Sequence, residues 1–295
     1  MQDVLKFLCK LPLYESVQPY DLYGYPEQQA ETQSNCQFEA KPVSTRDIRE
    51  LGNTTIETHG FTYFHHESKC DLNSKHFEEV KADKTVVQEY LYETIDMVRK
   101  KLDAVDVICF DWRFRRRDPK VAGKIPPRDI NNIRSWALPS GDVTHCDYSA
   151  VGGQDRLRMI LLPEELEKMH TNNHFASIYN VWRPLNKVVK NTPLLFCDKR
   201  TIQKTDLIEV DKVLQDKVEK SYFLFHRDYH KWYYLANQRS DEVFLFPTWT
   251  SKSDGGEHAD CSPHGAGASQ TDQWKDPRES VEVRMIVIQS NSHAE

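Results

Sequence analysis

The chain has 295 residues, which is enough to bury one large core, and all-β barrels with added helices often reach this size as a single domain. A formal net charge of −6 and a pI near 6.1 exclude a general electrostatic attraction to nucleic acid or to an acidic membrane. The seven cysteines form no C-x-x-C pair, so we expect free thiols in a reducing compartment instead of a zinc ribbon or a disulfide framework.

No segment approaches the roughly eighteen apolar residues that a membrane-spanning helix needs. The first eight residues also lack the basic and apolar regions of a secretory signal. Together with the negative net charge, these two observations predict a soluble, cytoplasmic protein that has neither a membrane nor a nucleic acid as its partner.

The first elements in chain order are short. Residues 1–40 are rich in Tyr, Pro and Gln and predict extended chain on a surface. A short helical run that follows Ser44, with Asp47 at the capping-box position, is expected to end near Leu51, and residues 60–64 alternate like a strand. The clearest helix is predicted over residues 83–102, with Asp83 as its N-cap. Its apolar stripe predicts packing on a sheet and consists of Val87, Leu91, Ile95, Val98 and Leu102.

A short strand over residues 105–110 and a polar loop over residues 111–132 are expected next. The loop contains the cluster Arg113-Phe114-Arg115-Arg116-Arg117. Two interpretations of this cluster stay open, a solvated loop and a contact with an anionic group of a substrate.

From about residue 140 the pattern changes to short strands separated by Pro, Gly and Asn. A strand over 143–149 is expected to break at Gly152-Gly153, and an apolar segment over 158–162 precedes a small helix that begins at Pro163. Further strands are predicted over 175–183, 192–197, 222–225, 231–235 and 242–246. This succession indicates a β-sandwich or a barrel, so the expected fold class is mainly β with flanking helices.

The segment His145-Cys146-Asp147, followed much later by His264 after Pro263, carries the main functional pattern. Side chains at positions i and i+2 of a strand face the same side, so His145 and Asp147 can reach one metal while Cys146 points away. Two imidazoles and a carboxylate on one face of an iron ion leave positions open for a chelating cosubstrate and O2. The pattern therefore predicts a non-haem Fe(II) oxygenase with His145, Asp147 and His264 as metal ligands and catalytic residues.

A second His-x-Asp pair, His258 and Asp260, is the rival to this ligand set. It lies in the segment of residues 251–263, which is rich in Gly and Ser and is expected to be a loop, where a rigid metal face is difficult to build. We therefore favour His145 and Asp147.

Fourteen residues after His264 the sequence reads Arg278-Glu279-Ser280 and then continues as a strand. A guanidinium matches a carboxylate, and a neighbouring hydroxyl adds one more donor, so Arg278 with Ser280 is the preferred site for the far carboxylate of 2-oxoglutarate. Arg284 shares their strand parity and is the competing candidate. The arginine that does not bind the cosubstrate is expected to pair with a glutamate, and Glu282 is the nearest partner for Arg284.

Several motifs in a fixed order resemble those of the fungal hydroxylase/desaturase family, which includes gibberellin desaturase and tailoring enzymes of secondary-metabolite clusters. The resemblance extends over most of the chain, and the motifs that carry it are Asn180-Val181-Trp182-Arg183-Pro184-Leu185, Pro193-Leu194-Leu195-Phe196-Cys197-Asp198, Trp232-Tyr233-Tyr234, Asp241-Glu242-Val243-Phe244-Leu245-Phe246 and Pro277-Arg278-Glu279-Ser280-Val281-Glu282-Val283-Arg284.

The resemblance implies a double-stranded β-helix, or jelly-roll, of the cupin type and dependence on Fe(II), 2-oxoglutarate and O2, with ascorbate as an in-vitro reductant. It implies one oxygenase domain over 1–295, with an N-terminal elaboration over 1–135 and the jelly-roll core over 136–290. Arg183 becomes a further candidate for cosubstrate binding, although a structural role fits it equally. Where an aromatic residue is expected soon after the distal histidine, the chain has Gly265-Ala266-Gly267-Ala268, which suggests a roomier pocket or dependence on a partner.

We therefore expect a 2-oxoglutarate-dependent dioxygenase that hydroxylates, desaturates or rearranges a hydrophobic, polycyclic small molecule. The main alternative is a non-catalytic jelly-roll subunit that pairs with an active homologue, and a homodimer or such a heterodimer is possible. A weaker alternative is a cupin-like isomerase that needs no 2-oxoglutarate.

Overall fold

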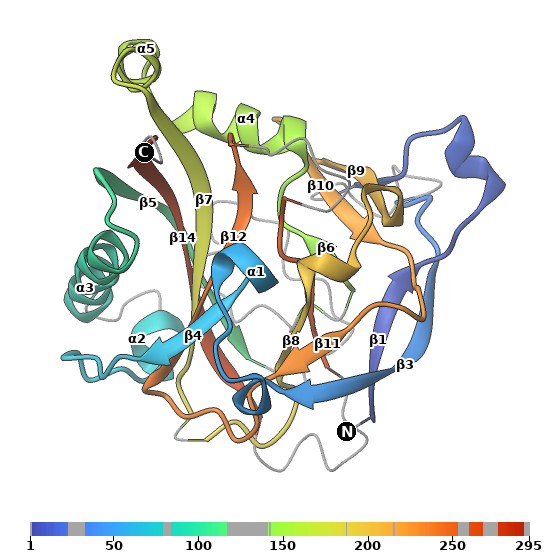
Figure 1. Cartoon of the computed structure of the whole chain (residues 1–295), viewed down its shortest axis with the longest axis horizontal. Coiled ribbons are helices and arrows are strands. Elements are labelled where there is room, and N and C mark those ends of the chain that lie inside the picture. The colour runs from blue at the N-terminus through green and yellow to red at the C-terminus, as the bar shows by residue number, and fades with distance from the viewer. Residues whose placement is uncertain are drawn as a thin grey trace.

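Two β-sheets that lie face to face make up most of the fold (Figure 1). The computed structural model describes residues 2–22, 33–78, 84–116, 141, 143–186, 188–214, 216–252, 260–267 and 277–291. Within these ranges, the larger sheet has nine strands in the spatial order β1 (Gln2–Leu8), β3 (Phe38–Asp47), β11 (Trp232–Tyr234), β8 (Leu194–Cys197), β13 (His264–Ala266), β6 (His145–Cys146), β10 (Val218–Leu224), β9 (Leu207–Val213) and β2 (Tyr20–Leu22).

The smaller sheet has five strands among the described residues, in the order β4 (Thr62–His65), β12 (Glu242–Thr250), β7 (His174–Pro184), β14 (Glu279–Ser290) and β5 (Asp106–Arg116). This arrangement is a jelly-roll, and the predicted fold class is confirmed. The strands predicted over 175–183, 192–197, 222–225, 231–235 and 242–246 are confirmed as β7, β8, β10, β11 and β12, with ends that differ by a few residues. Strands from both sides of residue 135 pair within each sheet, and a division of the domain at that point stays a prediction.

Alternating side chains of β12 show how the sandwich is filled. Phe244 and Phe246 face inward and pack on Phe196 of β8, with ring centroids 4.8 Å apart in both pairs. Val243 and Leu245 face outward and belong to the core beneath the helices. Each central strand of the smaller sheet is therefore buried on both faces, which explains its nearly continuous apolar sequence.

Helix α3 (Thr85–Lys101) confirms the predicted long helix and covers the outer face of the smaller sheet (Figure 1). Val87 and Val98 of the predicted stripe are buried in the same cluster as residues of β5, β7, β12 and β14. Lys84 occupies the N-cap position, and the predicted cap Asp83 lies outside the described residues.

The prediction of a loop from residue 111 onward is wrong as far as Arg116, because β5 continues through this segment and pairs with β14. Trp112 and Phe114 face outward and pack on Phe77, whereas the alternate residues face into the sandwich. Burial of two aromatic side chains holds this charged segment in the sheet. Residues 117–132 lie outside the described part of the chain.

Two arginines of the cluster on β5 form ion pairs with carboxylates of the sheet. Arg113 lies 3.1 Å from Asp111, and Arg116 lies 2.6 Å from Glu279 on the neighbouring strand. The interpretation of residues 113–116 as a solvated loop is therefore wrong, and Arg117 is not among the described residues.

The expected break at Gly152-Gly153 is also wrong, because both glycines lie inside helix α4 (Ala150–Ile160), which continues through the apolar segment near residue 158. Ser149 caps this helix by accepting a hydrogen bond from the amide of Gly152. A β-carbon on Gly152 would overlap the carbonyl oxygen of Lys220, and one on Gly153 would overlap the indole of Trp249. The glycines therefore permit close packing of α4 on β10 and β12, which outweighs their low helix propensity.

The remaining helical elements are short. Helix α5 begins at Pro163, as predicted. The helical run expected after Ser44 begins only at Ile48, as a 3-10 helix, because β3 extends through Ser44 to Asp47. Asp47 is its N-cap and accepts a hydrogen bond from the amide of Arg49. The short α-helices are α1 (Ile56–His59), α2 (Ser74–Glu78) and α5 (Pro163–Thr171), and the 3-10 helices are η1 (Pro12–Glu15), η2 (Ile48–Leu51), η4 (Lys199–Thr201) and η5 (Lys204–Asp206). Among the described residues, no helix has both the length and the apolar character needed to cross a membrane.

The close packing of α4 predicts that Gly152→Ala destabilises the protein. Although alanine is the better helix former, the added methyl group must displace the backbone of β10, and we expect the free energy of unfolding to fall by about 1–3 kcal/mol. Urea unfolding measures this change. Val151→Ala, at an exposed position of the same helix, is the matched control and is expected to have little effect. Equal stability of Gly152→Ala and the native chain would contradict the packing described here.

Candidate metal centre

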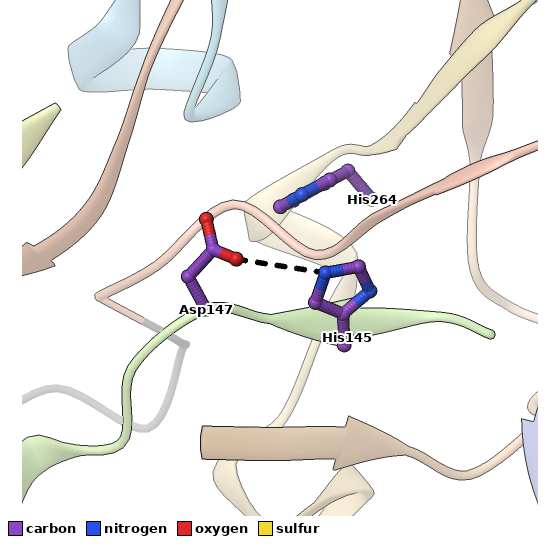
Figure 2. A group of neighbouring side chains, drawn as sticks. All are labelled: His145, Asp147 and His264. Carbon is purple, nitrogen blue, oxygen red and sulfur yellow. Dashed lines mark ion pairs between the residues drawn. The ribbon is translucent and has the colours of Figure 1, made fainter. Parts of the chain in front are cut away.

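His145, Asp147 and His264 meet in the interior of the sandwich (Figure 2). β13 pairs antiparallel with β6, and in this pairing His264 lies directly opposite His145. The two imidazole centroids are 4.6 Å apart, and one potential ligand atom from each of the three residues lies within 4.8 Å of the others. Such a set is compact enough to bind a single metal ion.

Backbone carbonyls orient both imidazoles in the same way. Nδ1 of His145 donates to the carbonyl of Val143, and Nδ1 of His264 donates to the carbonyl of Ser262, each over 2.8 Å. Because a carbonyl oxygen only accepts, the proton resides on Nδ1 and Nε2 carries the free lone pair. This is the tautomer in which Nε2 of a histidine binds a metal.

The carboxylate of Asp147 is buried and held from two directions. The amide of Asn180 donates to Oδ2 over 2.6 Å, and the guanidinium of Arg284 lies 3.2 Å from Oδ1. Burial raises the pKa of Asp147, but the charge of Arg284 outweighs it and holds that pKa well below its ordinary value. Asp147 is therefore ionised, as a metal ligand must be.

His264 lies in an aromatic environment between the sheets. Its ring packs edge-on against Phe246 at 4.9 Å and lies 6.0 Å from Phe196. Burial, and then the nearby charge of His145, lower the pKa of His264 to about 4, so its imidazole is neutral near pH 7. A neutral imidazole in a dry pocket is ready to bind a metal without first losing a proton.

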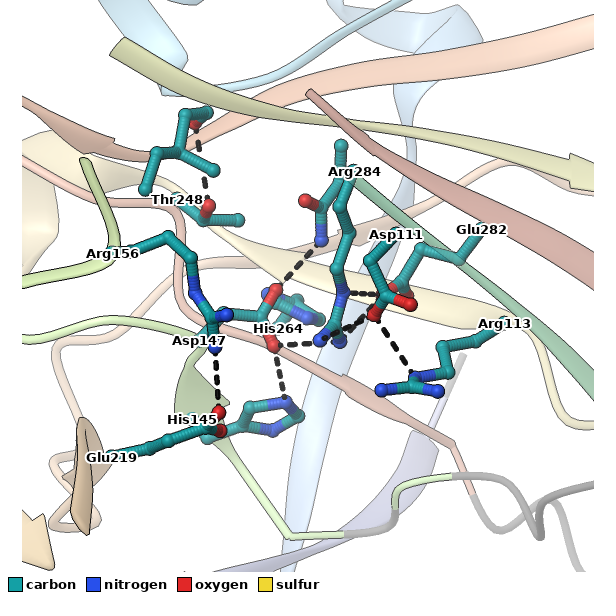
Figure 3. A network of polar contacts seen from close by, with 12 residues as sticks. Asp111, Arg113, His145, Asp147, Arg156, Glu219, Thr248, His264, Glu282 and Arg284 are labelled. Carbon is teal, nitrogen blue, oxygen red and sulfur yellow. Dashed lines mark hydrogen bonds and ion pairs between the residues drawn. The ribbon is translucent and has the colours of Figure 1, made fainter. Parts of the chain in front are cut away.

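A network of charged side chains surrounds Asp147 (Figure 3). Arg284 lies 2.7 Å from Glu282 and 3.8 Å from Asp111, in addition to its contact with Asp147. Burial raises the pKa of Glu282, but the charge of Arg284 outweighs it and leaves that pKa lowered. The salt bridge expected between Arg284 and Glu282 is therefore present. Its carboxylate partners indicate that Arg284 serves to balance buried charge.

Arg278 and Ser280 are both buried at the start of β14. The guanidinium of Arg278 lies over the ring of Trp182 at 5.3 Å and donates to the carbonyl of Thr192 over 2.6 Å. The hydroxyl of Ser280 is buried and has no hydrogen-bond partner among the described residues. A buried arginine beside an unpaired hydroxyl fits a small carboxylate ligand.

Arg183 lies on the other side of the smaller sheet. It donates hydrogen bonds to Tyr90 of α3 and to the carbonyls of His66 and Ser240. These contacts hold α3 and the segments around His66 and Ser240 against β7, which indicates a structural role for Arg183. The suggested role of Arg183 in cosubstrate binding stays a prediction.

Of the rival pair His258 and Asp260, only Asp260 is among the described residues. His258 lies outside them, and Asp260 lines a cavity of about 360 Å³ whose lining residues do not include His145, Asp147 or His264. Tyr148, Tyr222 and Trp249 give this cavity an aromatic wall.

The small residues after His264 have a packing explanation. Gly265 follows His264 in β13 and so faces the opposite side, where an added β-carbon would lie 3.3 Å from Leu5 of β1. One on Gly267 would overlap the carboxylate of Asp3. The two glycines therefore let the N-terminal strand approach β13, and they face away from the metal site. Ala266 shares the face of His264 and is a small residue there, so a roomier pocket stays a prediction, and Ala268 lies outside the described residues.

The prediction that all cysteines are free thiols is wrong for one pair, because Cys146 and Cys261 form a disulfide. Cys146 lies between two of the metal-binding candidates, and Cys261 precedes the third by three residues. The disulfide thus ties the two ligand-bearing segments together on the side opposite the imidazoles. Its partners are 115 residues apart, and sequence spacing alone gives no signal for such a pairing.

The chain matches a family model and is similar to known fungal proteins over most of its length. The family described as "Oxidoreductase/YMDC permease-like domain" matches residues 7–288. The hydroxylase/desaturase efuI of Hormonema carpetanum is 27% identical, over 89% of this chain and 88% of that protein. The Fe(II)/2-oxoglutarate-dependent dioxygenase nvfI of Aspergillus novofumigatus is 28% identical, over 90% of each chain.

A solved structure has the same fold. The iron and alpha-ketoglutarate-dependent endoperoxidase NvfI superposes with a TM-score of 0.76 at 24% identity, over 98% of both chains. The likeness covers the jelly-roll and the elements packed on it.

The disulfide predicts that five of the seven cysteines react with iodoacetamide when the protein is unfolded without a reductant, and that peptides containing Cys146 and Cys261 stay linked. Because the link closes a long loop, its reduction should lower the free energy of unfolding by roughly 2–4 kcal/mol. Peptide mass spectrometry and urea unfolding with and without reductant check both statements. Alkylation of all seven cysteines before reduction would contradict the pairing.

Proposed function

The chain belongs to the oxidoreductase/YMDC permease-like family and is similar to fungal hydroxylases and desaturases, and we propose that it is a Fe(II)/2-oxoglutarate-dependent dioxygenase. It hydroxylates, desaturates or rearranges a hydrophobic, polycyclic small molecule of fungal secondary metabolism. The observation that carries the proposal is the meeting of two preoriented imidazoles and one ionised carboxylate in a buried site.

His145, Asp147 and His264 would hold the iron. Imidazole nitrogen and carboxylate oxygen are the ligand types of non-haem Fe(II) oxygenases, and a facial set of three leaves further positions for other ligands. Each of the three side chains has a partner that fixes it before the metal binds. The donor set therefore fits the group that the family uses.

Arg278 and Ser280 would hold the far carboxylate of 2-oxoglutarate. The unpaired hydroxyl of Ser280 supports this assignment, because a buried polar group without a partner carries an energetic cost that a ligand can remove. Arg284 already has Glu282, Asp111 and Asp147 as partners, so a further carboxylate beside it would add negative charge to a site that holds three acidic groups.

When bound, iron and 2-oxoglutarate supply oxidative chemistry that consumes O2 and yields succinate and CO2. The protein contributes orientation and exclusion of water. Phe196 and Phe246 shield the ring of His264, and the inward-facing charges are paired with one another. Which product forms depends on where the substrate lies, since a displacement of about 1 Å is enough to change the reacting atom.

The aromatic cavity beside Tyr148 and Cys261 supports a hydrophobic substrate. Tyr148, which directly follows Asp147 in the sequence, is one of the residues that line this cavity of about 360 Å³. Tyr222 and Trp249 offer flat apolar surfaces to a ring system, and Lys204 and Gln154 offer polar contacts.

Nothing in the described site favours a non-catalytic subunit. Within the run of small residues that suggested it, Gly265 and Gly267 are explained by the packing of β1. Pairing with a second copy or with a homologous subunit stays part of the proposal, and light scattering on the purified protein would determine it.

We also propose a cytoplasmic location. The five free cysteines are typical of a reducing compartment, although the link between Cys146 and Cys261 departs from that pattern.

Substitution of each metal ligand tests the proposal directly. His145→Ala, Asp147→Ala and His264→Ala should each abolish Fe(II) binding and succinate formation, because two remaining ligands cannot retain the ion, while the fold persists. Metal analysis, a succinate assay and circular dichroism measure these three properties. Asp96→Ala, at an exposed position of α3, is the matched control and should keep all of them. An active Asp147→Ala together with an inactive Asp260→Ala would identify the rival pair as the true site.

Arg278→Ala should raise the KM for 2-oxoglutarate roughly 10- to 150-fold, which corresponds to the loss of a charged hydrogen bond of about 1.5–3 kcal/mol. Arg116→Ala removes an ion pair from the neighbouring strand and should leave this KM nearly unchanged. The initial rate of succinate formation at varied 2-oxoglutarate gives both values. Unchanged cosubstrate dependence in Arg278→Ala would favour Arg284 as the anchor or a reaction without 2-oxoglutarate.

A further inference from the structure

Asn180 is the polar residue of the smaller sheet that reaches the metal centre most directly. It lies in the middle of β7, between Phe246 of β12 and Arg284 of β14, and it is fully buried. Its side chain crosses the interior of the sandwich and donates to Oδ2 of Asp147 over 2.6 Å. One short hydrogen bond thus connects the central strand of one sheet to the metal-binding segment of the other.

The two oxygens of Asp147 have different surroundings (Figure 3). Oδ1 lies 3.6 Å from Nε2 of His145, the nitrogen that faces the metal position. Oδ2 lies on the side of Asn180, which occupies it with an N–H donor. The contact with Arg284 is also to Oδ1, so the hydrogen bond from Asn180 distinguishes the two oxygens.

The orientation of the Asn180 amide follows from chemistry. An ionised carboxylate only accepts hydrogen bonds, so the NH2 group and not the carbonyl group must face Asp147. The amide oxygen then points elsewhere, and it is buried without a hydrogen-bond partner among the described residues. The fold therefore tolerates an unpaired acceptor on Asn180, and we take this as a sign that its donor serves the site.

We propose that Asn180 is a positioning residue for the iron centre, and that it holds Oδ2 of Asp147 so that Oδ1 alone is turned toward the two imidazoles. This inference rests on the proposed function. A carboxylate free to rotate could bind the metal through both oxygens and would occupy a position needed by 2-oxoglutarate or O2. Asn180 therefore controls how many positions on the metal stay open.

Two substitutions at this position separate a hydrogen-bonding role from a space-filling one. Asn180→Ala removes both the amide and the volume of the side chain, whereas Asn180→Leu keeps a branched side chain of similar shape and removes the donor together with the unpaired amide oxygen. Thr248→Val is the matched control, because Thr248 is buried on the neighbouring strand and its hydroxyl donates to the carbonyl of Ile178 instead of to Asp147.

The measurements use the full chain without O2, with Fe(II) and with Co(II) as a spectroscopic substitute. We expect both Asn180 variants to bind either metal about 10- to 100-fold more weakly than the native chain, whereas Thr248→Val stays within about threefold. The visible absorption of the Co(II) protein should change in the Asn180 variants, because a second carboxylate oxygen on the metal alters its ligand field. Urea unfolding of the metal-free proteins shows whether each variant is folded.

Native metal affinity and a native Co(II) spectrum in folded Asn180→Leu would overturn the proposal. If Asn180→Ala is impaired and Asn180→Leu is not, Asn180 only fills space. Equal losses in Asn180→Leu and Thr248→Val would also overturn it, because a general loosening of the core would then be the cause. A native chain that binds no metal would instead refute the proposed iron centre, so the two failures are distinguishable.

Discussion

The pairing of β6 with β13 is the constraint on which the metal centre depends. It places His264 opposite His145, and it turns both side chains toward the same side of the larger sheet. Elements on the other side secure this short pairing, since the disulfide links the two segments and the glycines of β13 let β1 pack closely. A site built from two-residue and three-residue strands is rigid only because of such support.

The interior of the sandwich combines a dry aromatic region with a charged one. His264 lies against Phe246, whereas Asp147 lies among Arg284, Glu282 and Asp111. Removing charges from water is costly, so each acidic group here shares the guanidinium of Arg284. A metal that takes Oδ1 of Asp147 leaves Arg284 with two other carboxylates, and its charge stays compensated. Ser280 lies near the beginning of the same strand, and there a ligand carboxylate would accept a hydrogen bond from its unpaired hydroxyl.

Local patterns predicted those parts of the structure that depend on local physics. The spacing of His145 and Asp147, the stripe of α3 and the alternation of β12 are visible in the sequence because strand and helix periods determine which side chains share a face. The continuation of β5 and the glycines inside α4 were predicted wrongly, because distant partners such as Phe77 and Trp249 decide them. The disulfide and the contact from Asn180 to Asp147 join remote segments, so no spacing rule could indicate them.

The central claim is that one iron ion lies between His145, Asp147 and His264 with 2-oxoglutarate directed toward Arg278. A crystal structure prepared without O2 in the presence of Fe(II) and 2-oxoglutarate tests it most directly, with anomalous scattering at the iron edge to locate the metal. The account predicts a single strong peak beside Nε2 of both histidines and Oδ1 of Asp147, and a ligand carboxylate beside Arg278 and Ser280. Iron bound at His258 and Asp260, or a cosubstrate anchored by Arg284, would contradict it.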